Sequence, residues 1–257
     1  MPTAVGDGIA STITRAGLCC FGFLAILWGI ATLPTMLRQS VAVNTAKHII
    51  QGDTFKDGAL DSLRPAIATV SGDKWRRPSA LSSVAIITLR YLEEAMAAAD
   101  QAGIDPKMVG LDKTVRESLA NAPADPFLWL VLFWLENTHN GFSRNNLKYL
   151  RMSYQVGPSE GWVAVRRNRL AVAIFSQLPP DMAEDVVGEF SRLVESNFYA
   201  EAADILTGPG WPVRDRLLAG LKDVTDVDRE IFAKTVYRLG YDVAVPGVDR
   251  QDFRPWK

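Results

Sequence analysis

The apolar positions of this chain form one long unbroken run followed by many short periodic ones. Residues 16–37, AGLCCFGFLAILWGIATLPTML, carry no charge and lie between Arg15 and Arg38. A helix of about 20 apolar residues, rising about 1.5 Å per residue, crosses a hydrocarbon core of about 30 Å. The run therefore predicts a transmembrane anchor over 16–38, preceded by a short N-terminal tail over 1–15.

Three other interpretations of this run were weighed against the anchor. A cleaved signal needs about 7–15 apolar residues and a small-residue cleavage site; SVA at 40–42 resembles one, but the run is too long and Arg38 intervenes. A buried core helix would be striped rather than apolar all round. A dimerising helix is compatible with anchoring, although Gly17, Gly22 and Gly29 do not form a G-x-x-x-G motif.

The charges on the two sides of the run are nearly balanced, so they favour neither orientation in the membrane strongly. Arg15 and Asp7 precede it and Arg38 and Lys47 follow it, which slightly favours a cytoplasmic head. Long domains, however, translocate largely regardless of charge, and a short tail commonly stays inside. We expect the head on the trans side of the membrane.

Beyond the anchor, apolar residues recur at helical spacing, so an all-α head over 39–240 is predicted. The pattern indicates a short hairpin over 41–63, ended at Pro65, and a helix over about 80–101, ended at Gly103 with a turn at Asp105-Pro106. Further helices are expected over about 126–139, 146–156, 162–175, 181–194, 198–206, 211–222 and 226–239. Only 241–245, in a C-terminal tail over 241–257, could be extended.

Local stop and start residues set the boundaries of the central helices. Asp125-Pro126 is a favourable helix start, because Asp accepts free N–H groups and Pro suits the first helical position. The run that follows, FLWLVLFWLEN, is too short to span a membrane and predicts a buried helix closed by Asn140-Gly141. Gly157-Pro158 ends the next helix. Asp181 and Glu184 resemble a capping box.

Composition narrows the classes of function. The chain has 28 Lys and Arg against 29 Asp and Glu, and a balance near neutrality argues against a nucleic-acid partner. Its only cysteines, Cys19 and Cys20, lie in the anchor, so the head has neither a disulfide nor a thiolate metal site. Both cysteines are most simply small apolar residues, though S-acylation is open to them.

Trp129 and Trp162 are 33 residues apart, and each follows a turn by a few residues. The segment LKYLRMSYQVGPSEGW between them resembles the end of a tetratricopeptide repeat, whose period is about 34. Leu132 and Val165 take the apolar place three residues after each tryptophan, and Pro158 the closing place. Phe133 departs from the pattern, which has a small residue there. A generic array of α-hairpins is the alternative.

The resemblance implies an α-solenoid of antiparallel hairpins whose concave surface binds a peptide or protein. Anchored repeat proteins of this kind are similar to accessory proteins of bacterial envelope and surface-polysaccharide systems. It thus implies a single-pass protein of the bacterial inner membrane, with a periplasmic head. The expected partners are the lipid bilayer, envelope membrane proteins and an anionic polysaccharide, and not nucleic acid.

Residues that could carry chemistry are few. The carboxylates Asp181, Glu184, Asp185 and Glu189 share a helix, but a solvated face explains them better than acid–base catalysis. His139 follows Glu136 without a second histidine nearby, and no H-E-x-x-H, phosphate-binding loop or G-x-S-x-G motif occurs. We expect no catalytic residue, no metal and no cofactor, and therefore no enzyme.

Aromatic and basic residues instead suggest an interaction surface. Its candidate residues are Trp129, Trp162, Arg166, Arg167 and Arg169. A second basic cluster is Lys74, Arg76 and Arg77 beside Trp75. Such clusters meet anionic lipids or acidic glycans, although arginines also snorkel or pair with nearby carboxylates. Two alternatives to a scaffold follow: a glycan-binding module or enzyme with a Trp- and Arg-lined groove, and a structural subunit of a larger membrane complex.

The end of the chain, VPGVDRQDFRPWK, is rich in proline and charge. It either docks on a partner or lies as a strap across the end of the array. The strap is favoured, because Phe253 and Trp256 would otherwise be exposed apolar groups.

Overall fold

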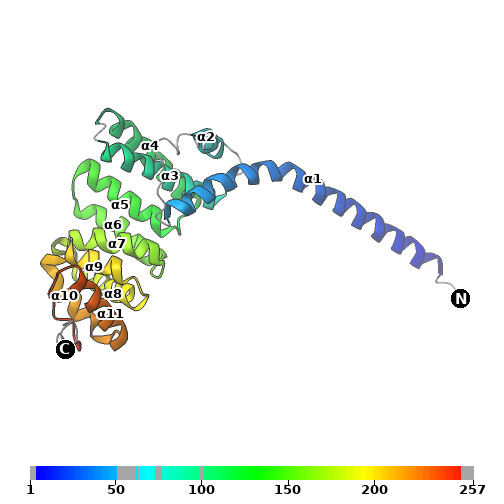
Figure 1. The fold of residues 1–257 in the computed structure, drawn as a ribbon. Coiled ribbons are helices and arrows are strands. Elements are labelled where there is room, and N and C mark those ends of the chain that lie inside the picture. Colours follow the sequence, from blue (N-terminus) through cyan, green and yellow to red (C-terminus); the bar gives the residue numbers. More distant parts are fainter. Residues whose placement is uncertain (1–3, 51–61, 63, 73–76, 99–100, 250–257) are drawn as a thin grey trace. The chain divides into compact units, whose positions relative to one another are not determined.

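The computed structural model describes residues 4–50, 62, 64–72, 77–98 and 101–249. Within these residues the regular structure is entirely helical, which confirms the all-α prediction (Figure 1). The helices are α1 (Ala4–Ile50), α2 (Arg64–Gly72), α3 (Pro78–Ala97), α4 (Gln101–Asn121), α5 (Pro126–Asn140), α6 (Leu147–Val156), α7 (Gly161–Ala173), α8 (Pro180–Glu195), α9 (Tyr199–Thr207), α10 (Arg214–Ala219) and α11 (Asp226–Arg238). Short 3-10 segments complete the connections between some of the later helices.

The chain divides into two compact units, Met1–Lys107 and Met108–Lys257, and the division falls within α4. The domain expected over 39–240 therefore extends across both units. The first contains α1, α2 and α3, and the second contains α5 to α11.

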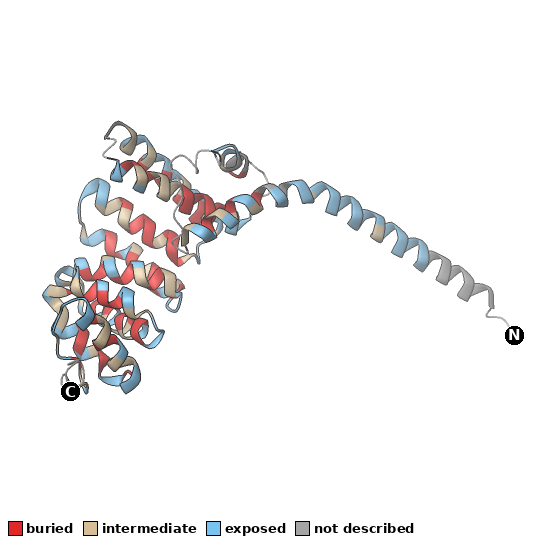
Figure 2. Cartoon of the chain, viewed as in Figure 1, coloured by how far each residue is buried: buried red, intermediate tan, exposed pale blue. Residues whose placement is uncertain are grey.

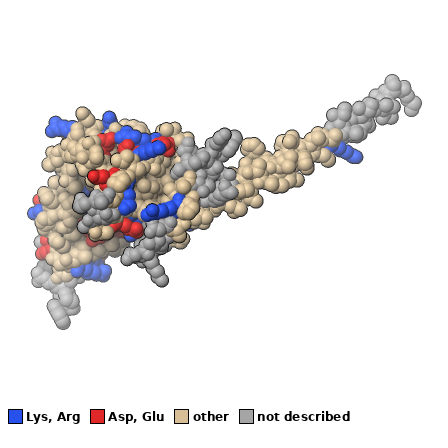
Figure 3. Space-filling model, turned by 90° about the horizontal axis from the view of Figure 1, so that it is seen from above, with Lys and Arg blue, Asp and Glu red and all other residues tan. Residues whose placement is uncertain are grey.

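Helix α1 contains a long apolar stretch that is not buried. Its stretch Thr14–Pro34 is long and apolar enough to cross a membrane, and none of it is buried (Figure 2). Phe21 and Trp28 are 73% and 62% exposed. In Figure 3 the uncharged part of this stretch is tan, because residues 16–34 contain no Lys, Arg, Asp or Glu. The stretch overlaps most of the predicted anchor over 16–38.

The same helix continues into the core of the first unit. Among the α1 residues whose burial is described, Gln39, Ala42 and Ala46 are buried. Ala42 shares one hydrophobic cluster with Val70 of α2 and with Ala80, Val84 and Ile87 of α3. The helix is continuous through residues 38 and 39.

The predicted hairpin over 41–63 is only partly described, because residues 51–61 and 63 lie outside the described residues. The prediction that Pro65 ends a helix is wrong, because Pro65 lies in the first turn of α2. Proline is tolerated there because first-turn N–H groups have no partner within the helix.

Helix α4 is absent from the prediction. Gly103 does not end the preceding helix, and Asp105-Pro106 is not a turn, because both lie inside α4. Met108, Leu111 and Val115 recur at helical spacing and are buried. Burial of this apolar stripe outweighs the local preference of Gly and Pro for a turn.

In the second unit, the expected start and end of α5 are confirmed. The Asp125 side chain accepts hydrogen bonds from the N–H groups of Phe127 and Leu128, and Pro126 is the first helical residue. Gly141 follows Asn140 with φ of 75°, a left-handed conformation that glycine adopts at no steric cost.

The helices of the second unit contact one another in succession. Helix α5 contacts α6 and α7, α7 contacts α8 and α9, and α9 contacts α8 and α11. Phe190 of α8 packs edge-on against Phe232 of α11, with 5.8 Å between ring centroids. Each helix thereby buries its apolar side against its neighbours.

The capping box predicted at the start of α8 is wrong. The helix begins at Pro180, so Asp181 lies inside its first turn, and Pro179 at the N-cap makes no side-chain cap. Pro180 suits the first helical position, and this preference places the start one residue earlier than the capping pattern does.

Candidate functional site

Trp129 lies half-buried between α5 and α6. Its indole N–H donates to the carbonyl of Pro123 over 2.7 Å. Its ring stacks on Tyr149 of α6, with 6.2 Å between centroids and 18° between planes. The ammonium of Lys148 lies 4.8 Å from the Tyr149 centroid. An aromatic pair with a cation on its face is a partly exposed patch able to contact an anionic or aromatic group.

Trp162 lies half-buried at the start of α7. Its ring packs against Phe127 of α5 with 4.8 Å between centroids. Arg166, one turn later, places its guanidinium 5.7 Å from the Trp162 centroid and donates to the Trp162 carbonyl over 3.2 Å. Arg169 is exposed and pairs with no described residue.

The two tryptophans do not form one surface. Trp162 packs against Phe127 of α5. Trp129, which itself lies in α5, stacks on Tyr149. Residues two apart in a helix point about 200° away from each other. The contacts of Trp129 and Trp162 therefore lie on different sides of α5, and the predicted surface becomes two patches.

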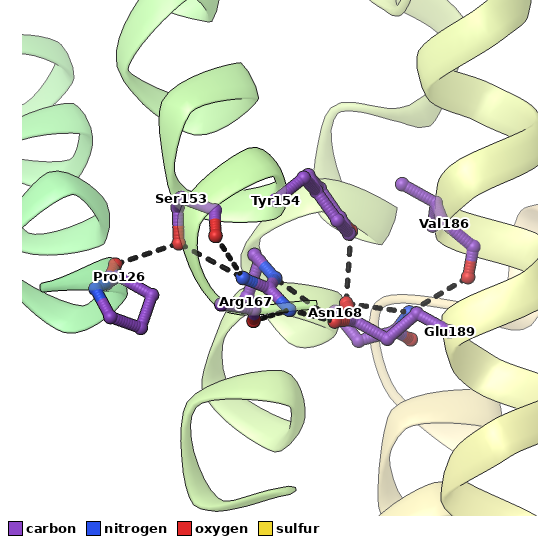
Figure 4. Close-up of polar contacts among 8 residues, drawn as sticks. Pro126, Ser153, Tyr154, Arg167, Asn168, Val186 and Glu189 are labelled. Carbon is purple, nitrogen blue, oxygen red and sulfur yellow. Dashed lines mark hydrogen bonds and ion pairs between the residues drawn. The ribbon is translucent and has the colours of Figure 1, made fainter. Parts of the chain in front are cut away.

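Arg167 is not a surface residue: the structure corrects this part of the prediction. Its side chain is fully buried, and all five N–H groups have acceptors (Figure 4). The Nε donates to Glu189 Oε1 over 2.9 Å, Nη1 to the carbonyl and hydroxyl of Ser153, and Nη2 to the Gly157 carbonyl and Glu189. The Ser153 hydroxyl in turn donates to the Pro126 carbonyl over 2.7 Å.

Glu189 completes this buried network and is likewise not part of a solvated face. Tyr154 donates its hydroxyl to Glu189 Oε2 over 2.9 Å, and Asn168 donates to the Val186 carbonyl over 2.8 Å. Burial raises the pKa of Glu189, although the charge of Arg167 opposes the rise. Burial and the charge of Glu189 raise the pKa of Tyr154 well above its usual value. Tyr154 therefore remains a donor.

The network links α5, α6, α7 and α8 through buried side chains. A buried charge pair is tolerated when its remaining polar atoms are hydrogen-bonded. Arg167 meets that condition, and its carboxylate partner is 1% exposed. The arrangement joins four helices through buried hydrogen bonds.

The other carboxylates of α8 remain at the surface. Glu184 and Asp185 are exposed, and exposed Asp181 pairs with Arg151 of α6. The hydrogen bond from Arg151 lowers the pKa of Asp181. These groups act as surface charges and one inter-helix ion pair.

His139 lines a groove of about 210 Å³ between α4 and α5. Arg116 lies within it and pairs with both Asp112 and Glu136, and these hydrogen bonds raise the pKa of Arg116. Asn140 donates to the other oxygen of Glu136 over 3.1 Å. In the described part of the chain, no three His, Cys, Asp or Glu side chains lie close enough together to hold a metal ion.

The described part of the C-terminal tail lies against its own unit. Residues 241–245 are irregular rather than a strand. Tyr241 packs against Trp211 with 5.0 Å between centroids, Val245 is buried, and Arg229 donates to the Pro246 carbonyl. The strap interpretation is supported up to here; Phe253 and Trp256 lie outside the described residues.

Of the second basic cluster, the described residue is Arg77, which is exposed at the N-cap of α3. Lys74, Trp75 and Arg76 lie outside the described residues.

No model of a protein family, no curated protein and no solved structure matches this chain.

Proposed function

We propose that this chain is a non-enzymatic, membrane-anchored interaction protein of the bacterial cell envelope. The observation that carries the proposal is the stretch Thr14–Pro34, which is apolar and wholly unburied although α1 is well formed. Full burial of one large apolar side chain stabilises by about 1.5–3 kcal/mol, so this many exposed side chains require an apolar surrounding. A bilayer is the surrounding whose thickness the stretch fits.

A tetratricopeptide-like solenoid is the arrangement we propose for the second unit. Trp129 and Trp162 lie early in α5 and α7, and these two helices contact each other as the first helices of stacked repeats would. The exposed residues Arg166 and Arg169, together with the Trp129–Tyr149 pair, are the proposed contact groups for a protein partner.

The burial and pairing of the titratable side chains favour a binding role over catalysis. Arg167 and Glu189 are buried and saturated with hydrogen bonds, and Arg116 occupies both carboxylates near His139. A groove lined by both tryptophans has less support, because their contacts lie on different sides of α5. An accessory role in surface-polysaccharide biosynthesis or export rests on the resemblance alone.

Photo-crosslinking in intact bacterial membranes tests the proposal. A crosslinking residue at Arg169 is expected to trap one discrete envelope protein, and one at buried Val172 should trap none because it lies away from the surface. The proposal is overturned if crosslinkers at Arg169, Arg166 and Lys148 all return no specific partner.

Labelling of intact cells tests the proposed periplasmic side. Exposed Ser176 is changed to Cys in a chain with Cys19→Ala and Cys20→Ala, and a membrane-impermeant maleimide is added. Labelling before lysis is expected; labelling only after lysis would place the head in the cytoplasm.

A further inference from the structure

Exposed apolar side chains of the second unit gather at its last helix. Among the described residues of this unit, six large hydrophobic side chains are exposed, and five of them lie in α11 or within three residues of its end. The five are Val227, Ile231, Tyr237, Leu239 and Tyr241. In an array of stacked helices, the terminal element needs a polar outer face to remain soluble on its own. Helix α11 departs from that rule, so its outer face is a candidate interface.

The outer face of α11 consists of residues that follow one another at helical spacing. These are Val227, Glu230, Ile231, Lys234 and Arg238. Intervals of three, one, three and four residues place all five along one side of a helix. The face therefore combines two exposed apolar residues with charges of both signs.

The rest of the second unit occupies the opposite side of α11. Phe232 and Val236 are fully buried. Arg229 donates to the Pro246 carbonyl, so the described part of the tail also contacts this side. Residues two apart in a helix point about 200° away from each other, which separates Arg229 from Val227. Val227 itself is 65% exposed, so the outer face is open.

The charges of α11 have the order that an antiparallel copy of the same helix would match. Asp226 and Glu230 lie in its first half, and Lys234 and Arg238 lie in its second half. Asp226 and Arg238 are each six residues from position 232, and Glu230 and Lys234 are each two residues from it. A two-fold axis at this level therefore brings each acid level with a base of the other copy. We propose that α11 pairs antiparallel with α11 of a second copy of this chain.

The apolar residues lie where such a pair would cover them. Ile231 is one residue from the axis, so its two copies would be only about 3 Å apart along the helices. Val227 would lie level with the last turn of the partner helix. The helix dipole alone favours acids at the start and bases at the end, but it does not account for exposed apolar side chains between them. Self-pairing accounts for both.

A contact along one helix is small. Helix α11 has 13 residues and is therefore about 20 Å long, and contacts that bury less than about 1,200 Å² are typically weak and transient. Two copies held in one membrane would meet at a raised effective concentration. The strength of the pairing thus rests on the proposed anchoring, whereas the face itself does not.

Disulfide trapping in the full-length chain tests the pairing and its direction. Ile231→Cys, Val227→Cys and Arg238→Cys are made singly in the Cys19→Ala, Cys20→Ala background, which lacks the two native thiols. Each chain is reconstituted at low density in phosphatidylcholine vesicles and oxidised with copper phenanthroline. Dimers are then measured on a non-reducing gel. Ser176→Cys, at an exposed position of the same unit, is the reference for random collision.

Ile231→Cys is expected to form a dimer several times faster than the reference. Val227→Cys alone should not, because its two copies would lie about 15 Å apart along an antiparallel pair, and a disulfide needs Cβ atoms within about 4.5 Å. A mixture of Val227→Cys and Arg238→Cys should form the heterodimer, since these positions would be level within about 1.5 Å.

A charge reversal tests the match of acids and bases. Arg238→Glu, added to Ile231→Cys, turns two attractive pairs into repulsive ones and should slow trapping about fivefold. The matched control is Arg169→Glu, the same charge change at an exposed position of α7, which should leave the rate unchanged. Equal rates for the two variants would overturn the proposed pairing.

The remaining outcomes separate the pairing from the anchoring. The pairing is wrong if Ile231→Cys is trapped no faster than Ser176→Cys, or if Val227→Cys alone is trapped as fast as the mixture, as a parallel pair would be. If the chain does not float with the vesicles, the anchoring fails. The same cysteine series in detergent solution at raised protein concentration then decides the pairing by itself.

Discussion

The apolar stretch of α1 and the junction of α6, α7 and α8 differ in which side chains they expose and which they bury. Thr14–Pro34 leaves its apolar side chains unburied, whereas Arg167 and Glu189 are charged and buried. Either arrangement alone would be costly in water. The junction offsets its cost internally, because every N–H of Arg167 has an acceptor within the chain. The apolar side chains of the α1 stretch are not buried by any other part of the described chain.

The largest test of this contrast makes the exposed stretch polar. Ile26→Arg with Leu27→Arg is expected to move the protein from the membrane pellet to the soluble fraction after a carbonate wash. Each arginine at the centre of a span costs about 2.5–3.5 kcal/mol by insertion measurements. The control is Val227→Arg, at an equally exposed position of α11, which should not alter the distribution. Unchanged membrane recovery of the double variant would contradict the anchor.

The next test breaks the buried pair. Arg167→Met leaves the Glu189 carboxylate buried without its counter-charge and should lower the free energy of unfolding by about 3–5 kcal/mol in urea titrations. Glu189→Leu added to it should recover much of the loss, since two apolar groups need no partner. Arg166→Met, one residue away and exposed, is expected to stay within about 0.5 kcal/mol of the original. Equal effects at 166 and 167 would refute the buried network.

A test with a smaller expected effect removes one hydrogen-bond donor to the Glu189 carboxylate. Tyr154→Phe deletes the hydroxyl that donates to Glu189 Oε2 and keeps the ring. A hydrogen bond to a charged group contributes about 1.5–3 kcal/mol, so the loss should be smaller than for Arg167→Met. Tyr149→Phe, at the half-exposed Trp129 patch, is the reference. The prediction fails if Tyr154→Phe unfolds at the same urea concentration as the original chain.

The smallest effect concerns a carboxylate at the surface. Hydrogen bonds from Thr225 and from Tyr199 lower the pKa of Asp228 below its usual 3.8. A lowered folded-state pKa contributes stability above the unfolded value, and this contribution is lost as pH falls through the folded value. Tyr199→Phe should shift the pKa of Asp228 upward in a carboxyl NMR titration. An unshifted titration would exclude the Tyr199 hydrogen bond.

The sequence predicts those features that are set by neighbouring residues. The start of α5 at Asp125-Pro126 and its end before Gly141 follow from capping chemistry within four residues of each boundary. The sequence pattern does not predict helix α4, because this helix depends on non-local packing. Leu111 and Val115 are buried, and that burial outweighs the preference of Gly103 and Pro106 for a turn. Local rules therefore fail where packing decides.

The buried network was missed for a different reason, although a pattern in α7 contained it. Val163, Ala164, Arg167, Asn168 and Ala171 are all buried, and their spacing is that of one helix face. Arg167 and Asn168 occupy core positions of this face, as Glu189 does beside Val186 and Phe190 in α8. The positions of these residues in the helical repeat, rather than their polar side chains, indicate that they are buried. Their partners across helices could not be deduced from spacing.

The unbroken course of α1 has a mechanical consequence. Forty-seven residues in a single helix make a rod about 70 Å long, and one end of that rod is fixed in the core of α2 and α3 through Ala42. Pro34 lies inside this helix, at the end of its apolar stretch. Because proline removes one backbone hydrogen bond of the helix, the apolar end and the packed end of α1 can bend relative to each other at this point.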